Sequence, residues 1–207
     1  MYKKFLKAFI AFLFISLSTI GFGQNTSCYN EAPVKLLDST VESFLTKLGT
    51  YKKPSLSQII ALVNQNIVPH TNFNVTARLV LGQKWRSINA TQKKEFVVAL
   101  KKMVLNTYSS AFVSYDGEEI DIKCPISYNT KKNRVEINSK VTHPQKRSFY
   151  LKYRLFKKGD KWFVYDIIID NVSIVNSYRQ TVKRLIEQNK DFNQVLKVME
   201  KKAKINS

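Results

Sequence analysis

The sequence is poor in the residues from which most catalytic sites and metal centres are built. It has two histidines, His70 and His143, and two cysteines, against 34 lysines and arginines. The four glycines after residue 23 are isolated, so they form no Gly-rich loop for phosphate. No His-Glu-x-x-His pair and no Gly-x-Ser-x-Gly elbow occurs. We therefore expect no enzymatic activity, no catalytic residue, no metal site and no cofactor.

Acidic residues are also scarce, and 15 Asp and Glu leave a formal net charge of +19. Three of the lysines lie among the first seven residues, before the apolar run AFIAFLFISLSTIGFG with its small residues Gly21 and Gly23. This pattern predicts a signal peptide over residues 1–23, cleaved near Gln24. A membrane anchor is disfavoured, because a span needs roughly 20 apolar residues. A lipidated Cys28 is disfavoured too, since no apolar residue precedes it directly.

The expected mature chain, 24–207, has a length that suits a single domain. Loss of three lysines lowers its charge to 19 − 3 = +16. That excess predicts attraction to anionic lipid headgroups, acidic protein faces or nucleic acid, unless the lysines only solvate the surface. An oxidising compartment would permit a disulfide between Cys28 and Cys124, and the sequence leaves open whether they meet.

The first half of the mature chain has the apolar period of helices. The spacing predicts a helix ending at Gly49, a second from Ser55 through residue 67, and a third ending at Gly82. The longest helix follows Thr91 and Gln92, and its apolar face contains Phe96, Leu100, Met103, Val104, Thr107 and Ala111.

At Gly117 the apolar period changes from about 3.6 to 2. Alternating runs over 119–128, 133–142, 147–157 and 161–170 are separated by short turns. They predict an antiparallel sheet with one buried face. Helices near 173–188 and 192–204 close the chain. The predicted fold is α+β, with helices at both ends around a curved antiparallel four-stranded sheet.

The run 161–170 is apolar on both faces of its predicted strand. Either helices cover both faces or the sheet curls around an apolar ligand cavity, and periodicity does not separate these arrangements. Strict alternation gives one face to Trp162, Val164 and Ile168, and the other to Phe163, Tyr165, Ile167 and Ile169.

Asp166 is the single carboxylate inside this strand. The nearest other carboxylate in the sequence, Asp170, would lie roughly 13 Å away along an extended chain, too far for an acid–base pair. We interpret Asp166 as structural, paired with a cation such as Arg179 or accepting backbone donors near the strand end. Ser173 is expected to cap the following helix.

Two blocks of the chain carry a family resemblance. In 72–120 the matching residues are Leu81, Gly82, Trp85, Thr91, Gln92, Phe96, Tyr108 and Tyr115. In 153–182 they are Tyr153, Gly159, Trp162, Asp166, Ser173, Tyr178 and Arg179. In order and spacing these residues resemble the MlaC (toluene-tolerance) family, the periplasmic phospholipid-binding components of the Mla lipid-transport system. The likeness covers about residues 30–200, with one departure: Asn72 stands where the family often has an acidic residue.

The resemblance implies a monomeric periplasmic carrier with phospholipid as cargo. Such a carrier would shuttle lipid between an outer-membrane lipoprotein–porin complex and an inner-membrane MCE-type ABC transporter, maintaining outer-membrane lipid asymmetry. Its apolar cavity would lie between sheet and helices. The candidate wall residues are Phe73, Leu81, Phe96, Leu100, Val104, Tyr108, Val135, Ile137, Phe149, Leu151, Tyr153, Val164 and Ile168. Each has ordinary core packing as its alternative role, and Trp85 and Trp162 are assigned to packing.

Other functional classes stay open. One is a secreted basic binding module with a filled core, which would bind an acidic protein or polymer and take up no lipid. A secreted hydrolase would need a convergent acid–base pair, and none has recognisable spacing. Export and the lack of a recognised motif argue against a nucleic-acid partner.

Overall fold

The structure is a computed structural model that describes residues 26–143, 145–189 and 191–205. The predicted signal peptide, 1–23, lies outside this range. The helices are α1 (Ala32–Gly49), α2 (Leu56–Asn66), α3 (Phe73–Leu81), α4 (Ala90–Ser109), α5 (Ile174–Gln188) and α6 (Phe192–Ile205). The strands are β1 (Glu119–Asn129), β2 (Arg134–Thr142), β3 (Phe149–Lys158), β4 (Lys161–Ile169) and the two-residue β5 (Val172–Ser173). The predicted α+β class is confirmed, with one short strand more than expected.

Local capping explains where the helices begin. The Ser55 side chain accepts from the Gln58 backbone and closes a capping box at α2, and Asn89 does the same with Gln92 at α4. The Asn72 side chain accepts from the Val75 amide at 3.1 Å and caps α3. An amide oxygen therefore caps the helix where the family often has a carboxylate.

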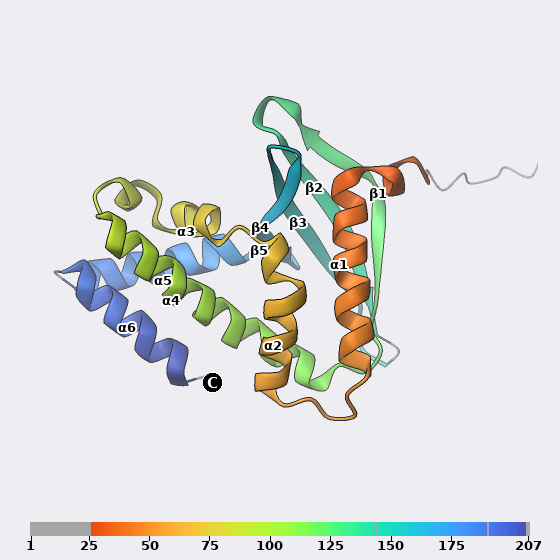
Figure 1. The fold of residues 1–207 in the computed structure, drawn as a ribbon, viewed down its shortest axis with the longest axis horizontal. Coiled ribbons are helices and arrows are strands. Elements are labelled where there is room, and N and C mark those ends of the chain that lie inside the picture. The colour runs from red at the N-terminus through yellow and green to blue at the C-terminus, as the bar shows by residue number, and fades with distance from the viewer. Residues whose placement is uncertain (1–25, 144, 190, 206–207) are drawn as a thin grey trace, which may run out of the picture.

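The strands form one antiparallel sheet in the order β1-β2-β3-β4-β5. Val135, Ile137, Tyr153 and Leu155 are buried on its inner face, on which α1 packs (Figure 1). The opposite, outer face carries polar residues, for example Glu136 of β2. This one-sided burial is the physical origin of the period of 2 in the sequence.

A β-bulge interrupts the alternation of β4. Arg154 pairs with Asp166 but Leu155 pairs with Val164, so Tyr165 is an extra residue. The predicted faces are therefore wrong beyond Tyr165, because one inserted residue moves every later side chain to the other face. Ile168 lies on the outer face opposite Lys152. Ile167 and Ile169 share the inner face with Val164.

The edge of β4 is covered by other parts of the chain. Thr71 forms a parallel bridge with Val164, and the Asn72 amide donates to the Val164 carbonyl at 2.9 Å. The Thr76 hydroxyl donates to the carbonyl of the bulged Tyr165 at 2.8 Å. With β5 paired to the end of the strand, these contacts satisfy edge groups that would otherwise template aggregation.

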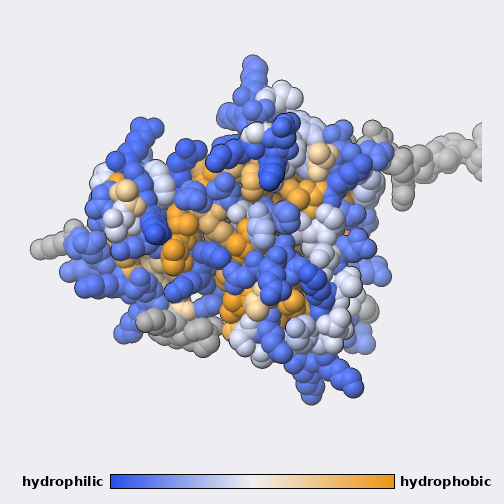
Figure 2. All heavy atoms as spheres, viewed as in Figure 1, coloured by the Kyte–Doolittle hydropathy of each residue, from blue (hydrophilic) through white to orange (hydrophobic). Residues whose placement is uncertain are grey.

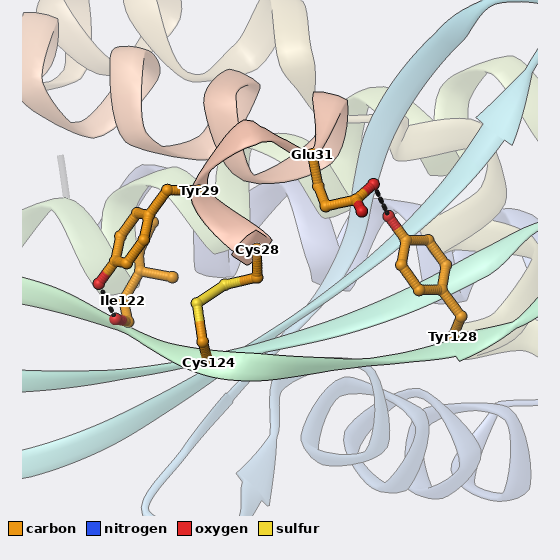
Figure 3. The surroundings of a disulfide bond; sticks show 6 residues. All are labelled: Cys28, Tyr29, Glu31, Ile122, Cys124 and Tyr128. Atoms are coloured by element: carbon orange, nitrogen blue, oxygen red, sulfur yellow. Dashed lines mark hydrogen bonds between the residues drawn. A yellow bond between two sulfur atoms is a disulfide. The ribbon is translucent and has the colours of Figure 1, made fainter. Parts of the chain in front are cut away.

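A disulfide between Cys28 and Cys124 joins the short helix η1 (Thr26–Asn30) to β1 (Figure 3). The Tyr29 hydroxyl donates to the Ile122 carbonyl at 2.6 Å, and the Tyr128 hydroxyl donates to the Glu31 carboxylate at 3.1 Å. Burial and the Glu31 contact raise the pKa of Tyr128 to about 12. The start of the described chain is thereby fixed to the sheet.

The buried apolar residues fall into three clusters. The helical cluster joins α3, α4, α5 and α6, and the sheet cluster lies between α1 and the inner face. A smaller cluster joins α1, α2 and α4 around Phe44 and Ile59. Figure 1 shows α3 to α6 gathered on one side of the molecule and the sheet with α1 on the other. A domain usually has one contiguous core with small satellites, so this division is unusual.

Candidate functional site

Half-buried apolar residues lie where the helical and sheet clusters meet. We call five of them the apolar seam: Val104, Tyr108, Leu151, Ile167 and Ile169. Val104 and Tyr108 are one helical turn apart on α4, while Leu151 and Ile169 are cross-strand neighbours. Ile167 packs against both clusters and so links them.

The molecular surface also carries apolar material in the middle of one face (Figure 2). In the view of Figure 2, apolar side chains gather along the middle of the face, between the α4 to α6 side and α1, with hydrophilic side chains around them. Exposed apolar area of this kind, rimmed by polar residues, marks a binding groove more often than an inert surface.

A cavity of about 350 Å³ opens beside the seam. It is lined by Met103, Asn106, Thr107, Tyr108, Ser177, Tyr178, Thr181 and Lys202, from α4, α5 and α6. The Tyr178 hydroxyl donates to Thr107 at 3.1 Å across it. Burial, and secondarily the charge of Asp166, raise the pKa of Tyr108, so its hydroxyl stays neutral. The volume lies within the range of small-molecule pockets.

The deepest of the predicted wall residues are packed by protein. Phe96, Leu100 and Ile137 are 0% exposed and Val135 is 1% exposed, while Leu81 and Tyr153 are also buried. They lie in two clusters, with Leu81, Phe96 and Leu100 on the helical side and the others on the sheet side. None of these six residues lines the cavity of about 350 Å³ beside the seam.

The remaining predicted wall residues are more open. Val104, Tyr108, Leu151 and Val164 are half-buried at the edges of the two clusters. Phe73 and Phe149 are half-buried and belong to none of the three clusters. Ile168 lies on the outer face, apart from the rest.

Sequence reasoning missed part of this site. Ile167 and Ile169 were assigned to the other face, and nothing in the residue types around Tyr165 announces a bulge. Asn106, Ser177, Thr181 and Lys202 line the cavity although each reads as a surface residue in the sequence. They meet only because α4, α5 and α6 pack together, which periodicity does not reveal.

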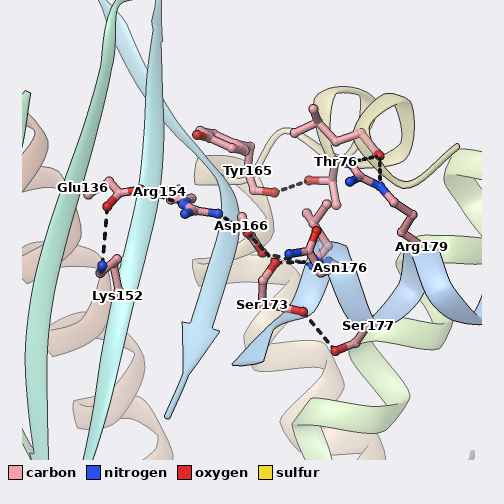
Figure 4. Close-up of polar contacts among 12 residues, drawn as sticks. Thr76, Glu136, Lys152, Arg154, Tyr165, Asp166, Ser173, Asn176, Ser177 and Arg179 are labelled. Atoms are coloured by element: carbon pink, nitrogen blue, oxygen red, sulfur yellow. Dashed lines mark hydrogen bonds and ion pairs between the residues drawn. The ribbon is translucent and has the colours of Figure 1, made fainter. Parts of the chain in front are cut away.

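The carboxylate of Asp166 makes structural hydrogen bonds with three neighbours (Figure 4). It accepts hydrogen bonds from the Ser173 hydroxyl at 2.7 Å, the Val175 amide at 3.0 Å and the Arg154 guanidinium at 3.3 Å. The Ser173 hydroxyl also accepts from the Asn176 amide and caps α5, as predicted. The suggested partner was wrong, because Arg179 donates instead to the Leu79 carbonyl.

Arg154 connects Asp166 to a second carboxylate on the outer face. It donates to Glu136 at 2.7 Å, and Lys152 lies 3.5 Å from the same carboxylate. Partial burial acts to raise the pKa of Glu136, but Arg154 and Lys152 outweigh it and hold that pKa below its ordinary value. Glu136 therefore stays ionised and is not a proton donor near neutral pH.

Two kinds of feature are absent from the described residues. In ranges 26–143, 145–189 and 191–205, no helix has the length and apolar character to cross a bilayer. Across the same part of the chain, no three His, Cys, Asp or Glu side chains group into a possible metal site.

Trp85 and Trp162 pack against the helical and sheet clusters, which confirms that their role is packing.

Comparisons with known proteins agree with the geometry. The chain is 25% identical over 158 residues to the intermembrane phospholipid transport system binding protein MlaC of Haemophilus influenzae, covering 72% of each chain. Its fold matches a phospholipid-binding protein of Ralstonia solanacearum, solved in complex with a phospholipid, with a TM-score of 0.76 at 20% identity. That match covers 83% of this chain and 97% of the other. A sequence model of the MlaC protein family matches residues 38–201, well over half of the chain, and the chain therefore belongs to the MlaC family.

Proposed function

We propose that this protein is a non-enzymatic periplasmic carrier that holds a phospholipid between its helical side and the inner face of its sheet. It is exported with residues 1–23 removed and works as a single domain. It passes lipid between an outer-membrane lipoprotein–porin complex and an inner-membrane MCE-type ABC transporter, and so maintains outer-membrane lipid asymmetry. The observation that carries the proposal is the apolar core divided along the seam.

The physical requirement for such a carrier is an apolar space that water does not enter. Each CH₂ group of an acyl chain that leaves water for an apolar site contributes about 0.8 kcal/mol of favourable transfer free energy. Val104, Tyr108, Leu151 and Ile167 are half-buried, so they still gain apolar contact when a chain enters between them. Parting two packed clusters along their boundary breaks fewer contacts than opening a single filled core.

The cavity beside the seam is mainly apolar and adds a few polar groups to this space. Tyr178, Thr107 and Ser177 offer hydroxyl groups, and Lys202 brings an ammonium group to the lining. A lysine recognises phosphate as a point charge without fixed geometry. We place the acyl chains along the seam and the phosphate near Lys202.

The relatives support the proposal and its non-enzymatic character. The Haemophilus protein is named for intermembrane phospholipid transport, and the Ralstonia protein holds a phospholipid. In this chain the buried Asp166 accepts three hydrogen bonds, and the negative charge of Glu136 is paired with Arg154 and Lys152. Neither carboxylate has the free geometry of a catalytic acid or base.

Leu151→Arg tests the position of the acyl chains. The substitution introduces a charge on the inner face at the seam, and a charge next to hydrocarbon is strongly unfavourable unless paired. We expect at least about a threefold loss of co-purified phospholipid, measured by extraction and mass spectrometry, in a protein that stays folded by circular dichroism.

Tyr150→Arg is the matched control. Tyr150 is the neighbour of Leu151 in β3 but faces outward and is 60% exposed. It should retain its lipid. Full loading of a folded Leu151→Arg protein would contradict the placement, and absence of lipid from all three proteins would favour the filled-core binding module.

A further inference from the structure

A second cavity, of about 520 Å³, shares no lining residue with the seam or with the cavity beside it. We call it the arginine cavity. Its wall comes from the β1–β2 hairpin, the outer-face residues of β3 and β4, and the first turns of α5. The lining residues that matter below are Lys132, Arg134, Arg154, Arg179 and Tyr165. Its lining is mainly polar, in contrast to the cavity beside the seam.

Positive charge in the arginine cavity exceeds the negative charge that faces it. Two carboxylates, Glu136 and Asp166, also line it, and both pair with Arg154 at 2.7 and 3.3 Å. Lys132, Arg134 and Arg179 form no ion pair with any of the described residues. The wall therefore holds four cations against two carboxylates, a net charge of 4 − 2 = +2.

Two of these cations are held in place by contacts that leave donors free. The Arg134 guanidinium lies over the Tyr165 ring at 5.1 Å, an arrangement that leaves its in-plane N–H groups unused. Arg179 donates from Nε and one terminal nitrogen to the Leu79 carbonyl at 3.0 and 2.7 Å (Figure 4). Its other terminal nitrogen keeps both hydrogens. A surface arginine in solvent is not normally held by such contacts. Because these two guanidinium groups are ordered before binding, they lose less conformational entropy when they bind an oxyanion.

The remaining wall resembles the centre of a protein interface. Tyrosine and arginine dominate the residues that carry binding energy in such interfaces, and here Arg134 lies over the ring of Tyr165 in the cavity wall. The cavity is larger than a bare phosphate needs, and the charge of +16 on the mature chain favours encounter with an acidic protein surface. A bilayer headgroup layer is broad, and a concave site favours a protruding loop over such a layer.

We propose that the arginine cavity receives an acidic segment of a partner protein, with Arg134 and Arg179 each binding the carboxylate of one Asp or Glu side chain. This rests on the proposed function, since a carrier has to dock on another protein to pass its cargo. Docking here leaves the seam free, because Glu136 and Arg154 lie on the outer face and the acyl chains on the inner one.

A direct test uses a fluorescein-labelled peptide of about eight alternating glutamate and glycine residues. Its anisotropy is measured with the full mature protein at about 0.15 M salt, where long-range attraction is screened. A charge-assisted hydrogen bond contributes about 1.5–3 kcal/mol, so Arg134→Gln/Arg179→Gln should raise the Kd of the peptide at least about tenfold. Arg134→Lys/Arg179→Lys keeps the charge, stays closer to the native packing and should still lose affinity severalfold without the planar fork.

Lys52→Gln/Lys53→Gln is the control with the same change in charge, in the exposed turn after α1 and outside the cavity. It should change affinity less than about twofold. Equal losses in both glutamine pairs would overturn the proposal in favour of general attraction. Unchanged peptide binding, with loss of binding to phosphatidylglycerol vesicles in the arginine variants, would overturn it in favour of a membrane surface. Lipid content of the same samples tests the proposed function separately.

Discussion

At the scale of the residue, Asp166 illustrates how a buried carboxylate can serve the fold alone. It is 5% exposed, and its three hydrogen bonds come from β3, from the Ser173 side chain and from the first turn of α5. The negative charge at this helix N-terminus also interacts favourably with the helix dipole. The residue thereby fixes the angle at which α5 leaves the sheet.

Asp166→Asn should destabilise the protein by about 2–3 kcal/mol, because the buried end of Arg154 loses a charged partner and one acceptor of the carboxylate becomes a donor. Urea unfolding measures the change. Asp160→Asn, in the exposed β3–β4 turn, makes the same chemical change without burial and should leave the midpoint unmoved. Equal midpoints for the two variants would show that the network contributes nothing to stability.

The sequence allowed part of this residue-level picture to be predicted. A structural role for Asp166 follows from its isolation among apolar residues, and the cap at Ser173 follows from residue type. The partner did not follow, because Arg154 lies opposite Asp166 only through the register of β3 and β4. Register depends on strand pairing far apart in the sequence, whereas caps depend on neighbours.

At the scale of the element, the Cys28–Cys124 disulfide attaches the start of the described chain to the sheet. It closes a loop of 96 residues between η1 and β1, which includes α1 to α4. A bridge across so long a loop restricts the unfolded chain strongly. Without it, η1 would keep only side-chain contacts such as that of Tyr29 with the Ile122 carbonyl.

Cys28→Ser/Cys124→Ser should therefore lower the free energy of unfolding by about 3–5 kcal/mol. Urea denaturation of the oxidised wild type and the variant gives the difference. Adding a thiol reductant should bring the wild type to the variant's midpoint and leave the variant where it is. A loss below about 1 kcal/mol would contradict a stabilising role for this bridge.

Element order followed closely from periodicity, and the element ends from Gly49, Gly82 and Ser55. The predicted helices and the four long strands are all present. The bulge at Tyr165 was not predictable, because the freed carbonyl of Tyr165 accepts from the Thr76 hydroxyl, 89 positions away in the sequence. The short β5 has only two residues, too few for a periodic pattern. That single bulge decides which isoleucines of β4 reach the seam.

At the scale of the molecule, the proposed function depends on a core that is divided and a surface that is strongly basic. The candidate pocket could be predicted from the sequence only as a set of apolar positions. Phe96, Leu100 and Ile137 have the same sequence character as Val104 and Leu151, yet the first three are 0% exposed and the last two are half-buried. Which apolar residue faces a ligand is set by how two clusters meet, and no local pattern records it.

Mass spectrometry of the mature protein, purified without detergent, tests the carrier function most directly. Native spectra are compared with spectra recorded after lipid extraction. A carrier should show a stoichiometric mass excess that extraction releases as phospholipid. A mass equal to that of the bare chain, unchanged after incubation with liposomes, would contradict lipid carriage and would mean that the seam stays closed.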